Sequence, residues 1–130
     1  MIRLWKSKIH YLWNMSDSLT REDIISVLRQ QKDFLHKKFY VKTIGIFGSF
    51  ARNEANENSD IDFLVEFEEG NLDYYMIRRN LNDFLSAEFK REVDIAISKA
   101  LKPFYKDTIL KQAVYAWFRQ EMHWGSSFLI

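Results

Sequence analysis

The stretch Gly48-Ser-Phe-Ala-Arg-Asn-Glu-Ala-Asn-Glu-Asn-Ser-Asp-Ile-Asp62 separates two short apolar segments of the sequence. Residues 41–47, just before it, are rich in β-branched and aromatic side chains and predict a buried strand that ends at Gly48. Residues 60–67 predict a second strand, which begins inside the quoted stretch. The polar residues between the strands predict a short helical turn and a loop.

Helical segments and a third strand flank this pair of strands. Thr20 and Asp23 resemble a capping box at the start of a helix that we expect to continue to about residue 39. Residues 72–89 predict a second long helix, and residues 92–97 alternate as a third strand. Pro103 suits the first turn of a last helix, with a predicted buried stripe of Tyr105, Ile109, Ala113 and Trp117. This order predicts an α/β (α+β) fold, a small mixed β-sheet flanked by helices.

Composition limits the possible classes of function. The 130 residues are 47% apolar, which predicts a folded globular protein rather than a disordered chain. The net charge of +1 provides no field that would gather nucleic acid, so no direct nucleic-acid partner is expected. The absence of cysteine excludes disulfides and thiolate zinc sites, and it permits a reducing compartment. No apolar run is long enough to cross a bilayer, so we expect no membrane partner.

The chain is predicted to hold one folded domain, over residues 16–120. Residues 1–15 are interpreted as a leader of uncertain status, because the convincing helix signals begin only after Met15. The segment is a poor signal peptide, since Lys6, Lys8 and His10 interrupt any apolar core. A membrane-surface helix is the alternative for this segment. Residues 121–130 are interpreted as an irregular C-terminal tail.

Three acidic residues form the first candidate site. Asp60 and Asp62 are two positions apart on a predicted strand, so both carboxylates point to one face. Two such carboxylates repel each other unless a cation lies between them, and Mg²⁺ binds carboxylate oxygens while leaving sites for phosphate. Asp94 interrupts an apolar strand, where a charge is costly unless it is paired or bound to metal. If the strands are neighbours, the three carboxylates can hold two metal ions about 3.5–4 Å apart for in-line displacement at phosphorus.

The turn Gly48-Ser49 is the second candidate site. A glycine lets the backbone approach a ligand closely, and Ser49 offers a hydroxyl and a backbone N–H to a phosphate. If residues 50–55 begin a helix, its positive end would also face the ligand. A phosphate-binding turn opposite metal-binding carboxylates suits phosphoryl or nucleotidyl transfer.

Each feature also has an ordinary structural interpretation. Asp-x-Asp on a surface strand is usually only solvated, Gly-Ser after a strand is usually a plain turn, and Asp94 could pair with Arg91 or Lys99. The combination of all three features favours the catalytic interpretation.

The quoted stretch resembles the signature of the DNA polymerase β superfamily of nucleotidyltransferases: Gly-Ser, ten residues, then Asp-x-Asp. Within it, Ala51-Arg52, Glu54-Ala55 and Ser59-Asp-Ile-Asp62 are similar to the minimal nucleotidyltransferase (MNT) branch, and Glu92-Val-Asp-Ile95 resembles that branch's third-carboxylate strand. The resemblance covers about residues 20–117. Asn53 stands where the branch usually has glycine; because Asn tolerates positive φ, we expect the turn to survive.

The resemblance implies a nucleotidyltransferase fold that uses ATP as substrate and Mg²⁺ as cofactor. Gly48 and Ser49 would hold the triphosphate, and Asp60 and Asp62 would hold both metal ions. Asp94 would hold the catalytic metal and help to activate the attacking hydroxyl.

Arg52 has two interpretations that the sequence leaves open. It would steady a phosphate, or it would pair with Glu54 or Asp60.

Members of the MNT branch are typically paired with a helical HEPN protein in prokaryotic toxin–antitoxin modules. The resemblance therefore implies a cytoplasmic antitoxin, in a hetero-oligomer with a HEPN-domain RNase toxin, that transfers AMP from ATP to a toxin tyrosine. One alternative is a non-catalytic antitoxin that masks the toxin by binding; the aromatic side chains available for this are Trp5, Trp13, Trp117 and Trp124, although core packing is favoured for Trp117. The other alternative is a small-molecule nucleotidyltransferase, which would need no protein partner.

Overall fold

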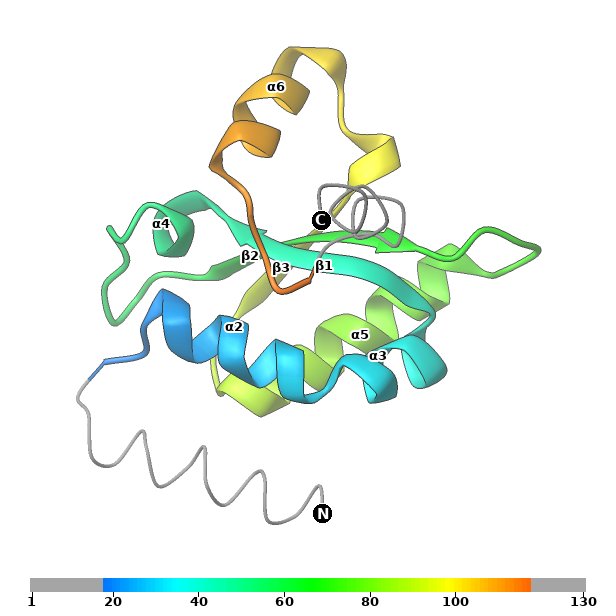
Figure 1. Cartoon of the computed structure of the whole chain (residues 1–130), viewed down its shortest axis with the longest axis horizontal. Coiled ribbons are helices and arrows are strands. Elements are labelled where there is room, and N and C mark those ends of the chain that lie inside the picture. Colours follow the sequence, from blue (N-terminus) through cyan, green and yellow to red (C-terminus); the bar gives the residue numbers. More distant parts are fainter. Residues whose placement is uncertain (1–17, 118–130) are drawn as a thin grey trace, which may run out of the picture.

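The computed structural model describes residues 18–117 of the chain. Helices α2, α3 and α5 cover one face of a β-sheet, and α6 lies over the opposite face (Figure 1). The elements follow in the order α2 (Arg21–Gln30), α3 (Lys32–Phe39), β1 (Val41–Phe47), α4 (Gly48–Ala51), β2 (Ile61–Phe67), α5 (Tyr74–Phe89), β3 (Val93–Ile97), the 3₁₀ helix η1 (Ser98–Ala100), α6 (Pro103–Gln112) and β4 (Val114–Tyr115).

The helix predicted after Thr20 begins as expected but is interrupted at Gln31. The hydroxyl of Thr20 accepts the backbone N–H of Asp23 at 3.1 Å, and the Asp23 carboxylate accepts the N–H of Thr20 at 3.0 Å, which confirms the capping box. The prediction of one continuous helix is wrong, because the backbone of Gln31 leaves the helical region, at φ −104° and ψ 17°. Its N–H is shared between the carbonyls of Val27 and Leu28. The result is two helices, α2 and α3, that both contribute side chains to one core.

Within residues 18–117, four strands form one mixed sheet in the order β3-β2-β1-β4. Strand β1 is antiparallel to β2, with Phe47 opposite Asp62, and β2 is parallel to β3, with Asp62 opposite Asp94. The parallel pair is connected through α5, since parallel neighbours require a crossover. The register therefore brings the end of β1 and the starts of β2 and β3 to one edge of the sheet.

Alternation along the strands gives the sheet two chemically different faces. On β2, Ile61, Phe63 and Val65 are fully buried in the core beneath the helices. Asp62 and Leu64 point to the other face; Leu64 is also buried, although it lies outside that core cluster. The acidic residue of β2 thus lies on the face that α2, α3 and α5 do not cover.

The predicted strands are confirmed, and the ends of two of them shift by one residue. Pro103 begins the last helix as predicted, but the buried stripe predicted for that helix is wrong. Helix α6 ends at Gln112 and has no buried residue, and Tyr105 is 54% exposed. The chain then returns as β4, because the free edge of β1 offers main-chain partners to the segment after the helix. No helix within residues 18–117 is both long enough and apolar enough to span a membrane.

Strand β4 can pair with β1 because Gly45 has no side chain. A Cβ at this position would lie 2.7 Å from the carbonyl oxygen of Val114 and 2.9 Å from the Cα of Tyr115. Directly after β4, the N–H of Ala116 donates to the carbonyl of Ile44 at 2.9 Å, which extends the pairing. The missing side chain at Gly45 therefore decides how closely the fourth strand approaches.

Replacing Gly45 with alanine should destabilise the fold by about 1–3 kcal/mol, because the added methyl group must displace main-chain atoms of β4. Urea unfolding followed by circular dichroism measures this change. Lys42→Ala on the same strand serves as the control and should change the free energy of unfolding by less than about 0.5 kcal/mol. Equal stability of G45A and wild type would contradict the close approach of β4.

Candidate functional site

The structure brings the three predicted carboxylates to the end of the sheet where β2 and β3 begin, which we call the acidic edge. Asp62 is the second residue of β2 and Asp94 the second residue of β3, and the two are direct partners in the parallel register. Partners on neighbouring strands lie roughly 5 Å apart with their side chains on the same face. Asp60 comes directly before β2, two positions from Asp62, and its charge acts on that carboxylate.

The electrostatics of Asp62 reflect this crowding. Burial raises the pKa of the Asp62 carboxyl above its ordinary value, and the negative charges of Asp94 and Asp60 raise this pKa further. The positive charge of Arg52 acts in the opposite direction and lowers it. A cation bound at this edge would stabilise the ionised form of Asp62.

Asp94 has different surroundings from those predicted. Its side chain is 72% exposed, because β3 is an edge strand and Asp94 points to the face that α2, α3 and α5 do not cover. The predicted cost of a buried charge therefore does not arise. The alternative interpretation, in which Asp94 pairs with Arg91 or Lys99, is not what the structure shows. Lys99 binds Glu69 at 2.6 Å, whereas a carboxylate oxygen of Asp94 lies 4.0 Å from Nη2 of Arg78 on α5.

The acidic residues fit a divalent metal ion by their chemistry. Their donors are all carboxylate oxygens, which are the hard ligands that Mg²⁺ binds. Within residues 18–117, no three or more histidine or acidic side chains are already gathered in a metal-binding arrangement.

Gly48 begins the turn at the end of β1 in a backbone conformation that favours glycine. Its φ of +71° lies in the left-handed region, where a side chain is disfavoured. A Cβ at Gly48 would overlap Oδ2 of Asp62 and lie 3.1 Å from its Cγ. The turn therefore packs directly against the central carboxylate, with Ser49 half-buried beside it. The short helix α4 starts at Gly48, earlier than the predicted start at residue 50.

Asn53 preserves the turn as expected. Its φ is +60°, and its N–H donates to the carbonyl of Phe50 at 3.1 Å. The N–H of Glu54 donates to the carbonyl of Ser49 at 2.8 Å, which closes the same turn. The expectation that Asn adopts the conformation usually taken by glycine is confirmed.

Arg52 pairs with a neighbour while remaining close to the carboxylates. Its Nε donates to Glu54 at 2.9 Å, one of the two pairings that the sequence allowed. Its Nη1 donates to Oε1 of Gln112 at 3.3 Å, and its charge acts on Asp62. The guanidinium thus lies between the turn and the end of α6; its contact with a phosphate stays a prediction.

Arg91 stabilises the loop that delivers Asp60, a role that the sequence did not predict. Its Nη1 donates to the carbonyls of Asn56, Glu57 and Ser59 at 2.9, 3.2 and 2.8 Å. Its guanidinium also lies 5.2 Å from the ring centroid of Phe50. One side chain therefore connects the start of β3 to the loop before β2 and to the turn after β1.

Arg78 and Gln112 were also missed. Arg78 donates to the carbonyl of Ile95 at 2.9 Å, which places its guanidinium at the outer edge of β3 near Asp94. Gln112 contacts the turn at Gly48, which lies 64 residues earlier in the chain. No sequence pattern indicates these residues, because their contacts depend on how distant elements pack.

Trp117 packs as favoured in the sequence analysis. Its ring lies against the core, its Nε1 donates to the carbonyl of Lys42 at 2.9 Å, and the ammonium group of Lys32 lies 5.5 Å from the ring centroid. Trp5, Trp13 and Trp124 lie outside the described residues.

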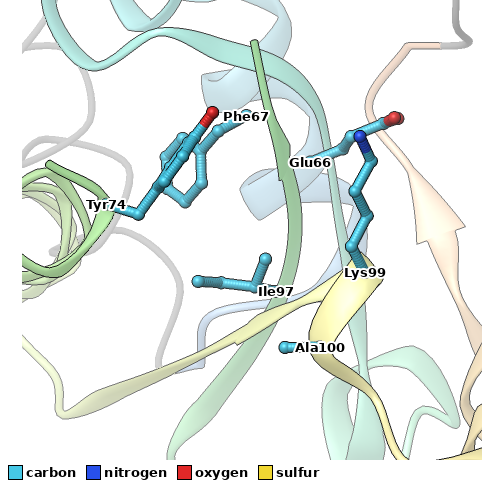
Figure 2. A pocket seen from close by; sticks show the side chains of 6 residues that line it. All are labelled: Glu66, Phe67, Tyr74, Ile97, Lys99 and Ala100. Atoms are coloured by element: carbon cyan, nitrogen blue, oxygen red, sulfur yellow. The ribbon is translucent and has the colours of Figure 1, made fainter. Parts of the chain in front are cut away.

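A pocket of about 310 Å³ lies at the opposite end of β2 and β3 from the carboxylates. Figure 2 shows the aromatic rings of Phe67 and Tyr74 on one side of β2, with Glu66 and Lys99 on the other. Because Glu66 lies four positions beyond Asp62 on one strand, the pocket is separate from the acidic edge by roughly 13 Å of strand.

Comparison with known proteins gives a consistent result. Residues 28–116 match the family described as nucleotidyltransferase domain. The protein adenylyltransferase MntA of Thermococcus cleftensis is 39% identical over 97 residues, which cover 75% of this chain and 96% of that protein. A solved structure described as a candidate minimal nucleotidyltransferase is 29% identical, has a TM-score of 0.61, and is matched over 76% of this chain and 98% of its own.

A further likeness concerns the fold alone. The similar structure is a chain from the complex of a tri-AMPylated HEPN toxin of Shewanella oneidensis with an MNT antitoxin. The TM-score is 0.53 at 17% identity, over 76% of each chain.

Replacing Gly48 with alanine should destabilise the fold by about 2–4 kcal/mol, because the left-handed backbone costs about 1–2 kcal/mol and the overlap with Asp62 adds to it. Asp62→Ala removes the overlapping atoms. In the double variant G48A/D62A only the backbone cost should remain, so a double-mutant cycle by urea unfolding should give a coupling of about 1–2 kcal/mol. Strictly additive effects would contradict the contact.

Replacing Asp62 with asparagine should stabilise the metal-free protein at neutral pH by roughly 1–4 °C in Tm, because it removes a charge from a crowded acidic edge. The folded state raises the pKa of the Asp62 carboxyl above its ordinary value of 3.8. Ionisation of Asp62 therefore lowers the stability of the folded protein as the pH rises from 3.8 through that raised pKa. The Tm difference between D62N and wild type should therefore be small near pH 3.8 and grow toward pH 7. Thermal scans in EDTA measure it, with Asp83→Asn as an exposed control; a difference independent of pH would refute the argument.

Proposed function

Because the chain belongs to the nucleotidyltransferase-domain family, we propose that it transfers AMP from ATP to a protein acceptor. The nucleotidyltransferase fold predicted from the sequence is confirmed. The observation that carries the proposal is the register of the sheet. It places Asp62 opposite Asp94, next to Asp60, with the Gly48 turn in contact with Asp62.

The proposed roles follow from these positions. The Gly48-Ser49 turn and the Arg52 guanidinium hold the triphosphate, since a backbone N–H, a hydroxyl and a guanidinium all donate to phosphate oxygens. The residues that hold Mg²⁺ are Asp60, Asp62 and Asp94. Bound there, Mg²⁺ would neutralise charge on the phosphates and orient them for in-line displacement.

The reaction forms one bond and breaks one. A hydroxyl oxygen of the acceptor bonds to the α-phosphorus of ATP, the bond from that phosphorus to the bridging oxygen breaks, and pyrophosphate leaves. Asp94 is more exposed than its partner Asp62, so a large acceptor can reach it. In this proposal Asp94 is the group that takes the proton from the hydroxyl. The half-buried Asp62 stays beneath the phosphates, against Gly48.

The acceptor in this proposal is a tyrosine of a HEPN-type toxin, and the chain acts as its antitoxin. The support is the match over nearly the whole of a relative named as a protein adenylyltransferase, and the likeness in fold to a chain from a complex with an AMPylated HEPN toxin. A masking antitoxin is the second candidate. It is favoured by the aromatic side chains of Phe104 and Tyr105 on α6, which are 84% and 54% exposed and could anchor a partner without chemistry.

The decisive experiment purifies the chain with the protein encoded beside it, adds ATP and Mg²⁺, and records intact masses of both. The partner should gain one or more AMP units, and EDTA should prevent the gain. The double variant Asp60→Asn/Asp62→Asn should form the same complex with at least a hundredfold less modification, because phosphate charge is no longer neutralised. Asp83→Asn, exposed on α5, is the matched control and should behave as wild type.

Three other outcomes would point elsewhere. An unmodified partner that is still inhibited in a stable complex would establish masking. Modification of a small molecule by the isolated chain would establish a small-molecule nucleotidyltransferase. Full activity of the double variant would remove the acidic edge from the reaction.

A further inference from the structure

The last residue of α6 lies on the donors that the proposed function assigns to the triphosphate. Oε1 of Gln112 accepts the backbone N–H of Gly48 at 3.4 Å and Nη1 of Arg52 at 3.3 Å. A backbone amide and a guanidinium that converge on one oxygen are the environment in which a phosphate oxygen is commonly bound. Here that oxygen belongs to a neutral amide of the chain itself.

The structure also explains why Gln112 is held over the turn. Helix α6 has no buried side chain, so little apolar packing determines its position. Its C-terminal end is determined instead by β4, which begins two residues after Gln112 and pairs with β1 beside Gly45. Because β1 leads directly into Gly48, this pairing places the side chain of Gln112 next to the turn.

We propose that Gln112 belongs to the nucleotide site, and that its amide oxygen holds the place of a phosphate oxygen until ATP binds. The inference rests on the proposed function, because it takes Gly48 and Arg52 as phosphate donors. The two hydrogen bonds to Gln112 are long and involve a neutral acceptor, whereas a phosphate oxygen forms shorter, charge-assisted bonds with the same donors. ATP therefore displaces the amide of Gln112. The free energy of the two hydrogen bonds that are lost weakens the binding of ATP.

The identity of the residue is consistent with such a role. Glutamine reaches both donors without adding charge. A glutamate of the same length would pair strongly with Arg52 and add a further negative charge near Asp62, which already lies opposite Asp94. A neutral acceptor can satisfy the donors and still be displaced.

Isothermal titration of the full chain with ATP and Mg²⁺, without a partner, tests the proposal. Gln112→Ala should bind ATP about two- to fivefold more tightly than wild type, since ATP no longer displaces a side chain. Gln112→Glu should bind at least about tenfold more weakly, because a carboxylate competes with phosphate for Arg52. Leu110→Ala is the matched truncation, because position 110 lies about 200° around α6 from position 112. This variant should leave the Kd for ATP unchanged.

A structural role for Gln112 would give a different result. Adenosine, titrated by NMR, carries no phosphate and should bind Q112A and wild type equally. Unchanged or weaker ATP binding by Q112A, or an equal change for adenosine, would overturn the inference and leave the proposed function intact. If wild type binds no ATP, the proposed nucleotide site itself is absent, and both proposals fail.

Discussion

The contact between Gly48 and the carboxylate of Asp62 is the constraint on which the rest of the site depends. The antiparallel register sets Phe47 opposite Asp62, so the residue after β1 must turn away at the point where the carboxylate stands. Only a residue without Cβ fits there, and only glycine adopts the required φ without cost. The turn with Ser49 and Arg52 is thereby held against the acidic edge, instead of extending into solvent as an ordinary hairpin loop would.

The two faces of the sheet divide stability and chemistry between them. One face buries Ile61, Phe63 and Val65 under α2, α3 and α5, and this apolar burial is the main source of stability. The other face carries Asp62, whose partial burial and repulsion by Asp94 and Asp60 oppose folding. Because adjacent positions on a strand point to opposite faces, the same seven residues of β2 serve both purposes, and the unfavourable charge of Asp62 is carried by a well-packed strand.

Arginine side chains support the site by donating to main-chain oxygens. Arg91 holds three carbonyls of the loop before β2, Arg21 donates to the carbonyl of Ala51 at the end of α4, and Arg78 donates to Ile95 at the outer edge of β3. Such bonds satisfy main-chain carbonyls, which need hydrogen-bond partners where the main chain is buried or bent. The pocket lined by Phe67, Tyr74 and Lys99, at the other end of the sheet, lies beyond this arrangement (Figure 2).

Local chemistry determined what the sequence alone could show. Strand alternation, the capping box at Thr20 and the positive φ tolerated by Asn53 depend on neighbouring residues, and each was predicted and found. The fold class followed from the order of such elements, and the candidate residues from the spacing of Gly48, Asp60 and Asp62. Other features depend on packing between distant segments: the return of β4 beside Gly45, the exposure of Asp94, and the placement of Arg91 and Gln112. Only the tertiary structure decided these, because main-chain hydrogen bonds and edge positions in a sheet carry no side-chain pattern that a sequence could display.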